Sequence, residues 1–325
     1  MKFDDIFSYY EKDLSLIEKR LRDIFQSDTP LIPLIGEHIV RGGGKRLRPL
    51  FLILSSELAG YHSEDRTLLA AIIEAIHTAS LLHDDVVDNA ETRRGRPAAH
   101  MVWSNQIVIL VGDFLYANAL RLAVLQRSQR IMETLSHATT AMTEGEVLQL
   151  HRVADPDITE EEYYRIISAK TGALISAACR IGAILGNLPE KEEEALAGFG
   201  MKTGIAFQMA DDILDYMADE SGLGKKLGKD LGEGKITLPL IYLLKMAGDD
   251  EEKREIKEII KHDISVEDNL TRILELFDKY SAIEESFRSA QKLVKEAKDE
   301  LEIFAPSRGR DALLTLADYA LARDK

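Results

Sequence analysis

The sequence predicts an all-α protein, and two observations support that prediction. Apolar side chains recur at the spacing of an amphipathic helix almost throughout the chain, most clearly over residues 69–88 and 192–219. Alternating β-branched segments, which would indicate strands, do not occur in the sequence. We therefore expect a bundle of roughly ten to thirteen helices, several of them longer than about 20 residues.

The expected helices are separated by clusters of glycine, proline or asparagine, which interrupt helical periodicity. In chain order these clusters are residues 40–45, 90–97, 153–157, 186–190, 222–235 and 304–310. Thr159 followed by Glu162 has the pattern of a capping box and predicts a helix start. The segment from Gly248 onward is rich in Glu and Lys, as is typical of solvated amphipathic helices. Since no Pro- or Ser-rich linker divides the chain, we expect one domain over residues 1–325.

Composition and charge exclude several classes of protein. The 325 residues include 56 acidic and 41 basic side chains, which give a net charge of −15. We expect no nucleic-acid partner, because phosphate neutralisation needs a basic surface. The single cysteine, Cys179, excludes an internal disulfide and fits a reducing compartment. No uncharged apolar stretch of about 18 residues occurs, and the first residues are acidic, so we expect a cytoplasmic protein without a membrane span.

Two segments far apart in the chain share the pattern Asp-Asp-x-x-Asp. They are residues 84–88 and 211–215, and each closes a strongly apolar helical segment. On a helix, Asp84 and Asp88 lie on one face, while Asp85 is turned about 100° away. Carboxylates this close repel each other unless a cation lies between them.

The ligand chemistry of these two clusters favours magnesium. Oxygen donors without cysteine or paired histidine suit Mg²⁺ better than Zn²⁺, and Mg²⁺ commonly shares its coordination shell with phosphate groups. We therefore expect the two clusters to face each other and to hold a diphosphate through Mg²⁺. The alternative is two solvated helix ends.

Cationic side chains and glycines accompany the clusters. Glycine lets the backbone approach a phosphate closely, and arginine matches phosphate oxygens with two parallel hydrogen bonds. Residues 42–49 combine three glycines with three cations, and this segment predicts a second phosphate site or, taken alone, a surface loop. The cations concerned are Arg93 and Arg94 after the first cluster, Lys225, Lys226, Lys229 and Lys235 after the second, and Lys45, Arg46 and Arg48 in residues 42–49.

Three further side chains have two interpretations each. His77 lies two turns before Asp84 on the same helix face, and is either a hydrogen-bonded core histidine or a substrate contact. Gln208 lies three and four residues before Asp211 and Asp212, on the helix face that it shares with them, and has the same two interpretations. Lys170 lies within an apolar helical segment, so it needs an acidic partner or a bound phosphate.

Taken together, these segments resemble the trans-isoprenyl diphosphate synthase (polyprenyl synthetase) family of head-to-tail prenyltransferases. The similarity is strongest over about residues 30 to 245 and is greatest to the bacterial medium- and long-chain members. The segments that carry it, in the order of the family, are GGGKRLRP, HTASLLHDDVVDNAETRRG, GDFLYANA, AKTGAL, FQMADDILDY and GKDLGEGKITLPL.

The resemblance implies a fold and an activity. The fold is a single-domain, barrel-like bundle of long helices around a central cavity, in a homodimer. The activity is condensation of isopentenyl diphosphate with an allylic diphosphate to an all-trans polyprenyl diphosphate. The implied cofactor is Mg²⁺, three ions with substrate bound. A shorter-chain farnesyl or geranylgeranyl diphosphate synthase is the alternative.

The resemblance also assigns residues by matching motif. The residues implied to bind Mg²⁺ are Asp84, Asp88 and Asp211, with Asp85, Asp212 and Asp215 oriented nearby. The residues implied to hold the allylic diphosphate are Arg93, Lys170, Lys225 and Lys235. The residues implied to hold the diphosphate of isopentenyl diphosphate are Lys45, Arg48, His77 and Arg94. The residues implied to line the reacting carbons are Thr171 and Gln208.

Product length is expected to depend on the helix that carries the first cluster. Ala79 lies five residues before Asp84, about 7.5 Å along the helix axis, and Ser80 lies one residue nearer. The family uses a bulky residue here to close the cavity for short products. The small Ala79 therefore predicts long products, of about thirty to fifty carbons, because a deeper cavity admits a longer ligand. The alternative is that Ala79 only allows two helices to pack closely.

The same interpretation gives a mechanism. The allylic diphosphate departs, the double bond of isopentenyl diphosphate attacks the allylic cation, and a proton is lost to the departed diphosphate, since no side chain is an obvious general base. Water would trap the cation, so we expect the glycine-rich residues 222–235 to close over the site.

Three rival interpretations fit the sequence less well. A di-iron carboxylate bundle needs two Glu-x-x-His units, and only Glu74 to His77 has that form. A class I terpene cyclase would usually lack the second Asp cluster and residues 42–49. An inactive partner subunit would have lost aspartates or the arginine pair, and all are present.

Overall fold

The structure, a computed structural model, describes residues 2–217, 228–261 and 267–322, and in these ranges its regular secondary structure is almost entirely α-helical. The all-α prediction is therefore confirmed. The described residues form more helices than the ten to thirteen expected. The excess arises because helices such as Phe3–Tyr9, Ala99–Val102 and Lys229–Gly232 are too short to produce a periodic pattern.

The described chain divides into two compact units. Unit 1 comprises residues 2–139, 174–200 and 301–316, and unit 2 comprises the described parts of residues 140–173, 201–300 and 317–322. The expectation of a single domain over residues 1–325 is not decided by this division and stays a prediction. The helices that contribute residues to both units are α8 (Gln129–His151), α10 (Ala173–Leu185), α11 (Glu190–Leu214) and α18 (Arg308–Tyr319).

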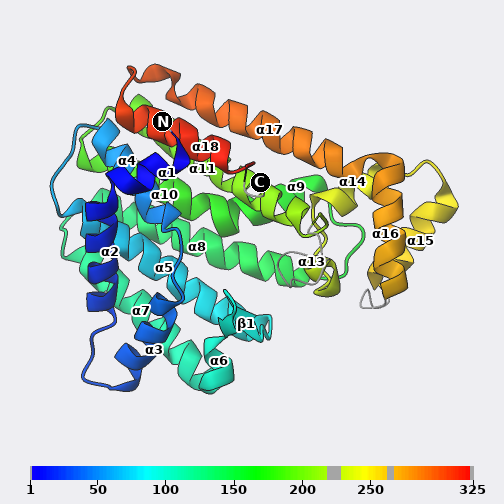
Figure 1. The fold of residues 1–325 in the computed structure, drawn as a ribbon, viewed down its shortest axis with the longest axis horizontal. Coiled ribbons are helices and arrows are strands. Elements are labelled where there is room, and N and C mark those ends of the chain that lie inside the picture. The colour runs from blue at the N-terminus through cyan, green and yellow to red at the C-terminus, as the bar shows by residue number, and fades with distance from the viewer. Residues whose placement is uncertain (1, 218–227, 262–266, 323–325) are drawn as a thin grey trace. The chain divides into compact units, whose positions relative to one another are not determined.

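Unit 1 is organised around a long, mostly buried helix, α5 (Arg66–Val87). Its neighbours α2, α4 and α7 pack along it (Figure 1). Ile72, Ile73 and Ile76 of α5 are at most 1% exposed, and burial of such side chains contributes about 1.5–3 kcal/mol each. The other elements of unit 1 are α1 (Phe3–Tyr9), α2 (Glu11–Ile24), α3 (Leu31–Arg41), α4 (Leu47–Leu58), α5 (Arg66–Val87), β1 (Thr92–Arg93), β2 (Arg96–Pro97), α6 (Ala99–Val102), α7 (Asn105–Val124) and the 3₁₀ turn η2 (Leu301–Ile303).

The turn predicted at residues 90–97 is a small β-hairpin. Its strands β1 and β2 pair antiparallel, with Arg93 opposite Arg96. The two corner residues, Arg94 and Gly95, have φ values of 52° and 71°. Positive φ at both corner residues is the geometry of a tight type I′ turn. The hairpin therefore places Arg93 and Arg94 directly after the end of α5.

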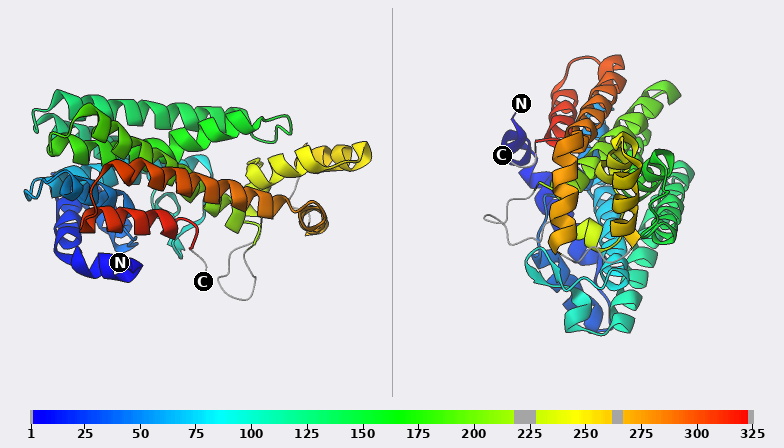
Figure 2. Two further views of the ribbon diagram at one scale, coloured as in Figure 1. Left: turned by 90° about the horizontal axis from the view of Figure 1, so that it is seen from above. Right: turned by 90° about the vertical axis from the view of Figure 1, so that its right-hand side faces the viewer.

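Unit 2 has its own core, in which α14 packs against α17 and α16 (Figure 2). Leu238, Leu240 and Leu243 of α14 and Ile273 of α16 are fully buried in this core. The elements of unit 2 are α9 (Glu160–Ile167), the π-helical turn η1 (Ser168–Gly172), α13 (Lys229–Gly232), α14 (Leu238–Met246), α15 (Asp250–Lys261), α16 (Glu267–Tyr280) and α17 (Ala282–Glu300).

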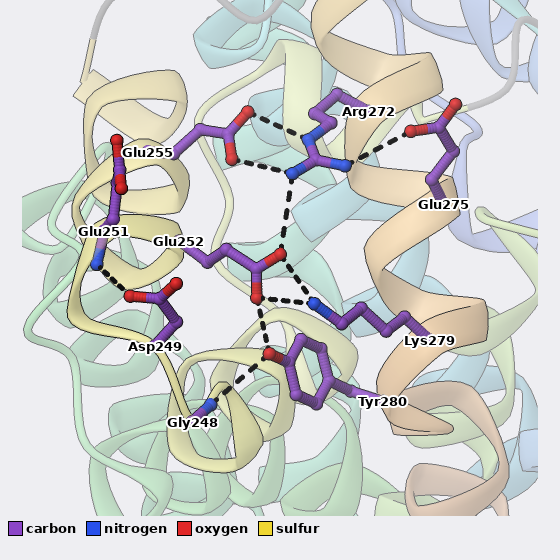
Figure 3. A network of polar contacts seen from close by, with 9 residues as sticks. All are labelled: Gly248, Asp249, Glu251, Glu252, Glu255, Arg272, Glu275, Lys279 and Tyr280. Carbon is purple, nitrogen blue, oxygen red and sulfur yellow. Dashed lines mark hydrogen bonds and ion pairs between the residues drawn. The ribbon is translucent and has the colours of Figure 1, made fainter.

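Local polar signals predicted two features of unit 2. Thr159 caps α9: its Oγ1 accepts a 3.1 Å hydrogen bond from the Glu162 N–H, and the Glu162 carboxylate accepts from the Thr159 N–H at 3.0 Å. The capping box is thus confirmed. The Glu- and Lys-rich helices α15 and α16 are joined by a surface network in which Arg272 binds Glu255 and Lys279 binds Glu252 (Figure 3). Such surface pairs contribute about 0–1 kcal/mol each, less than the roughly 1.5–3 kcal/mol from burial of each isoleucine of these two helices in the core.

Two helical stretches in the described ranges are long and apolar enough to cross a membrane, judged by length and composition alone. They are α7, of which 33% is buried in its most apolar window, and Glu160–Leu185, of which 61% is buried. Core helices of soluble proteins pass the same test. The absence of a membrane span therefore stays a prediction.

Candidate active site

The first carboxylate cluster lies at the C-terminal end of α5. Asp84 and Asp85 are in its last turn, and Asp88 caps it, with its N–H donating to the Asp84 carbonyl at 2.7 Å. Asp85 is 3% exposed and accepts hydrogen bonds from Arg93 at 2.6–2.8 Å. Asp84 and Asp88 are only half-buried. Asp85 therefore holds Arg93 beside the cluster, while the other two carboxylates are more accessible, as the helical spacing predicts.

His77 is hydrogen-bonded to Arg48, another residue predicted to belong to the site. The Arg48 guanidinium donates to His77 Nε2 at 2.9 Å. Burial and the positive charges of Arg48 and Arg93 lower the pKa of His77 well below its usual value, so the ring is neutral and accepts this hydrogen bond. The structure thus brings together Arg48 from α4 and His77 from α5, which lie 29 residues apart in the chain.

The glycine-rich segment at residues 42–44 meets the arginine hairpin. Gly44 has a φ of 147°, and a Cβ built on it would lie 2.7 Å from Nη1 of Arg94. Any side chain at this position would therefore displace the guanidinium of Arg94, and the positive φ would add backbone strain. The neighbouring Lys45 lies 5.7 Å from the centroid of the Phe3 ring, in a cation–π contact. Lys45, Arg48, His77 and Arg94, which the resemblance groups as one diphosphate site, all lie in unit 1.

Arg46, from the same predicted phosphate loop, has a structural role. Its guanidinium binds Glu18 at 2.6 Å and Glu74 at 2.8 Å, and its side chain is 7% exposed. Burial of one charge without its partners would be costly, so these ion pairs fix the loop onto α2 and α5. A pocket in unit 1 lies beside this residue and is lined by Glu74, Leu82, Arg94 and Ala99 among others.

The second carboxylate cluster ends α11 in unit 2. Asp212 is 3% exposed, and its two carboxylate oxygens accept hydrogen bonds from Gln208 Nε2 at 2.8 Å and from the Tyr163 hydroxyl at 2.6 Å. Burial, together with Asp211 and Asp215, raises the pKa of Asp212 to about 6, and the two hydrogen bonds oppose that shift. Asp211 is exposed. Gln208 is therefore bound to the cluster, and Tyr163 is a member that the sequence did not indicate.

A fourth carboxylate of unit 2 belongs to this group. The Asp230 N–H donates to Asp215 Oδ2 at 2.9 Å. Burial and the negative charges of Asp212 and Asp215 raise the pKa of Asp230 to about 8, against the opposing effect of Lys235. Lys235 also pairs with Glu233 at 2.6 Å. Asp230 was missed because no motif spacing relates it to residues 211–215.

Lys170 has the acidic partner that its position required. Its ammonium binds Glu146 and the side-chain oxygen of Gln149. Lys170 and Thr171 lie in η1, a π-helical turn between α9 and α10, where regular helix was expected. Such turns often occur at functional sites. The Thr171 hydroxyl donates to Gln208 Oε1 at 2.8 Å, so the structure joins this turn to the second carboxylate cluster.

The remaining predicted residues divide into two groups. Ala79 is 1% exposed and Ser80 is half-buried, with its hydroxyl donating to the His77 carbonyl at 2.8 Å. Lys225, Lys226 and the other residues at positions 222–227 of the proposed covering loop lie outside the described residues, whereas positions 228–235 are described.

The donor chemistry of both clusters fits Mg²⁺, since each offers carboxylate oxygens without a thiol or an imidazole pair. Within the described ranges, no group of three His, Cys, Asp or Glu side chains lies close enough to hold a metal ion. Mg²⁺ typically uses one or two carboxylates together with waters and substrate phosphates. The clusters belong to different units, so their expected convergence stays a prediction.

The sequence is similar to those of known proteins. The polyprenyl synthetase family model matches residues 29–277. The chain is 38% identical to octaprenyl diphosphate synthase from Escherichia coli over 325 residues, which are 100% of both chains. It is also 38% identical to a short chain isoprenyl diphosphate synthase from Methanothermobacter thermautotrophicus over 330 residues, 100% of this chain and 99% of that one.

A solved structure is similar in both fold and sequence. The polyprenyl synthase from Caulobacter crescentus, complexed with calcium and isoprenyl diphosphate, superimposes with a TM-score of 0.92. The two are 39% identical, and the match covers 99% of this chain and 98% of that one.

Proposed function

The chain belongs to the polyprenyl synthetase family, and from that premise we propose that it is a trans-prenyltransferase that elongates an allylic diphosphate with isopentenyl diphosphate to a long all-trans polyprenyl diphosphate. The observation that carries the proposal has two parts. The chain has two helix ends with the pattern Asp-Asp-x-x-Asp, and in unit 1 the cations Arg48 and Arg94 come from separate segments. Carboxylates that bind a divalent cation and guanidiniums that bind phosphate are the two groups that recognition of a diphosphate requires.

In unit 1, we assign Lys45, Arg48 and Arg94 to the diphosphate of isopentenyl diphosphate. The neutral His77 keeps Arg48 oriented through their 2.9 Å hydrogen bond, and the absence of a side chain at Gly44 leaves room for Arg94. Arg93, the residue before Arg94, is already fixed by Asp85 and would bind the allylic diphosphate. Binding geometry set before substrate arrives reduces the entropy lost on binding.

In unit 2, we assign Lys170 to the allylic diphosphate and Thr171 with Gln208 to the region of the reacting carbons. Until the substrate binds, Glu146 compensates the Lys170 charge and the side-chain oxygen of Gln149 accepts a hydrogen bond from the ammonium. Departure of the diphosphate leaves an allylic cation, which the double bond of isopentenyl diphosphate attacks. The proton is then lost, and the departed diphosphate is the base that we propose.

Asp84, Asp88 and Asp211 would hold Mg²⁺, and we propose three ions with substrate bound. The chemistry that Mg²⁺ supplies is neutralisation of the negative charge that develops on the departing diphosphate. Asp85, Asp212 and Asp215 would orient the binding carboxylates, since their oxygens are already bound by Arg93, Tyr163, Gln208 and the Asp230 N–H.

We further propose a homodimer formed through α7. This helix carries Ile109, Leu110 and Val124 at 40%, 66% and 56% exposure, an unusual apolar face for a free surface. A second copy of the chain would cover it. Light scattering should therefore report a dimer for the wild type and a monomer for Leu110→Glu.

We also propose a cytoplasmic location, with delivery of the product to a membrane. The lone buried Cys179 supports a reducing compartment.

Incubation with radiolabelled isopentenyl diphosphate, Mg²⁺ and each allylic primer, followed by sizing of the hydrolysed products, tests the activity. We expect labelled chains of about thirty to fifty carbons, as a deep cavity would allow. Products of fifteen or twenty carbons would instead establish the short-chain alternative, which the similarity to the Methanothermobacter enzyme supports. Diphosphate release from the primer alone, without incorporation of label, would contradict the prenyltransferase assignment.

A further inference from the structure

Tyr163 is a buried residue of α9 whose hydroxyl binds the second carboxylate cluster. The hydroxyl lies 2.6 Å from Asp212 Oδ2, although 49 residues separate the two in the chain. Both side chains are 3% exposed, and both belong to unit 2. A buried tyrosine hydroxyl needs an acceptor, and many could serve. Here the acceptor is a carboxylate next to one assigned to Mg²⁺.

The hydrogen bond from Tyr163 completes a network of donors that ends on the Asp212 carboxylate. Thr171 donates to Gln208, and Gln208 donates to Asp212 Oδ1, each at 2.8 Å. Tyr163 donates to the other oxygen of Asp212. The carboxylate therefore cannot rotate without the loss of two hydrogen bonds. A close approach of η1 to α11 supports the network, since a Cβ on Gly204 would lie 2.7 Å from Gly172 Cα.

The two clusters differ in the charge of the groups that bind their central aspartate. Asp85 is paired with the cationic guanidinium of Arg93. Asp212 is bound by the neutral Tyr163 and Gln208, and no ion pair to it occurs in the part of the chain that the structure describes. Neutral donors orient a carboxylate without cancelling its charge, so they leave the field of the cluster available to a bound cation.

We propose that Tyr163 is a positioning residue for the second cluster, whose hydroxyl fixes Asp212 and thereby holds Asp211 and Asp215 in place for a divalent cation and diphosphate. The inference rests on the proposed function and extends it to a residue outside the two aspartate motifs. Groups that orient metal ligands typically change metal affinity by about 10- to 100-fold when they are removed.

The test compares Tyr163→Phe with Tyr164→Phe, which removes the hydroxyl of the adjacent tyrosine, a group bound to Tyr242 rather than to the cluster. Mn²⁺ binding in the presence of inorganic pyrophosphate is measured by electron paramagnetic resonance. We expect roughly tenfold weaker Mn²⁺ binding by Tyr163→Phe and unchanged binding by Tyr164→Phe. Unchanged Mn²⁺ binding by Tyr163→Phe would overturn the proposal.

Two further measurements separate positioning from a merely structural role. In steady-state kinetics, Tyr163→Phe should raise the Mg²⁺ concentration needed for half-maximal rate and leave KM for isopentenyl diphosphate unchanged. In an Asp212→Asn background, Tyr163→Phe should have no additional effect on Mn²⁺ binding, because its hydroxyl acts through that carboxylate. A full additional effect there would contradict the proposal.

The binding measurement does not depend on turnover. Weaker Mn²⁺ binding by Tyr163→Phe, found together with a wild type that makes no prenyl product, would support the role of Tyr163 and reject the proposed function.

Discussion

Arg94 lies against Gly44, so closely that a Cβ on residue 44 would be 2.7 Å from the Arg94 guanidinium. This contact joins two predicted phosphate-binding segments, residues 42–49 and the arginine hairpin. Gly44→Ala should displace Arg94 and raise KM for isopentenyl diphosphate roughly tenfold, since small displacements in a binding site are costly. KM for the allylic primer should change little. Steady-state kinetics with each substrate varied in turn measures both constants.

Gly43 offers a matched control for that substitution. It also has a positive φ, 67°, but a Cβ there would meet nothing within 4 Å. Gly43→Ala therefore introduces backbone strain of about 1–2 kcal/mol in the same loop without displacing Arg94. Equal rises in KM for the two variants would show that strain of the loop, rather than the Arg94 contact, is responsible.

Asp230 provides a prediction about pH. Its pKa of about 8 in the folded, metal-free protein lies far above the ordinary value near 4. The folded state therefore retains a proton that the unfolded state loses, so Asp230 destabilises the fold progressively as pH rises from about 4 to 8. Asp230→Asn should be more stable than the wild type by up to about 5 kcal/mol at pH 9 and equally stable near pH 4. Urea unfolding in the presence of a chelator measures this, and a difference independent of pH would contradict it.

Ala79 is the basis of the prediction on product length. It is 1% exposed on α5, one turn and a half before Asp84. Ala79→Tyr should shorten the products if a growing chain passes this position. Ser80→Phe, at a half-buried neighbour, tests the same wall with less risk to packing. Thermal unfolding verifies that both variants fold, and product profiles identical to that of the wild type would exclude the wall.

Features set by neighbours in the chain could be predicted from the sequence. The capping box at Thr159 depends on a residue three positions later, and the different exposure of Asp84 and Asp85 follows from helical geometry. The helices were predictable because apolar periodicity extends over many turns. Lys170 was predictable in part: its buried charge required an acidic partner, but nothing in the sequence identified Glu146.

Features that depend on packing could not be predicted. Tyr163 reaches Asp212 from 49 residues away, and Asp230 joins Asp215 through a backbone N–H that carries no sequence signature. Arg46 has the same chemistry as its neighbours Lys45 and Arg48, yet it is buried against Glu18 and Glu74. Which cation of a basic loop faces a ligand is decided by the helices around it.

The central claim is that carboxylates from both Asp-Asp-x-x-Asp clusters bind Mg²⁺ around a diphosphate. The most direct test is the rate of product formation in the wild type, Asp84→Ala and Asp211→Ala during removal of divalent ions with a chelator and their return as Mg²⁺. We predict complete loss of wild-type activity on chelation, full recovery with Mg²⁺, and rates lowered by about two orders of magnitude or more in both variants, each of which retains its circular dichroism spectrum. Full activity in the chelated enzyme, or in either variant, would contradict the claim.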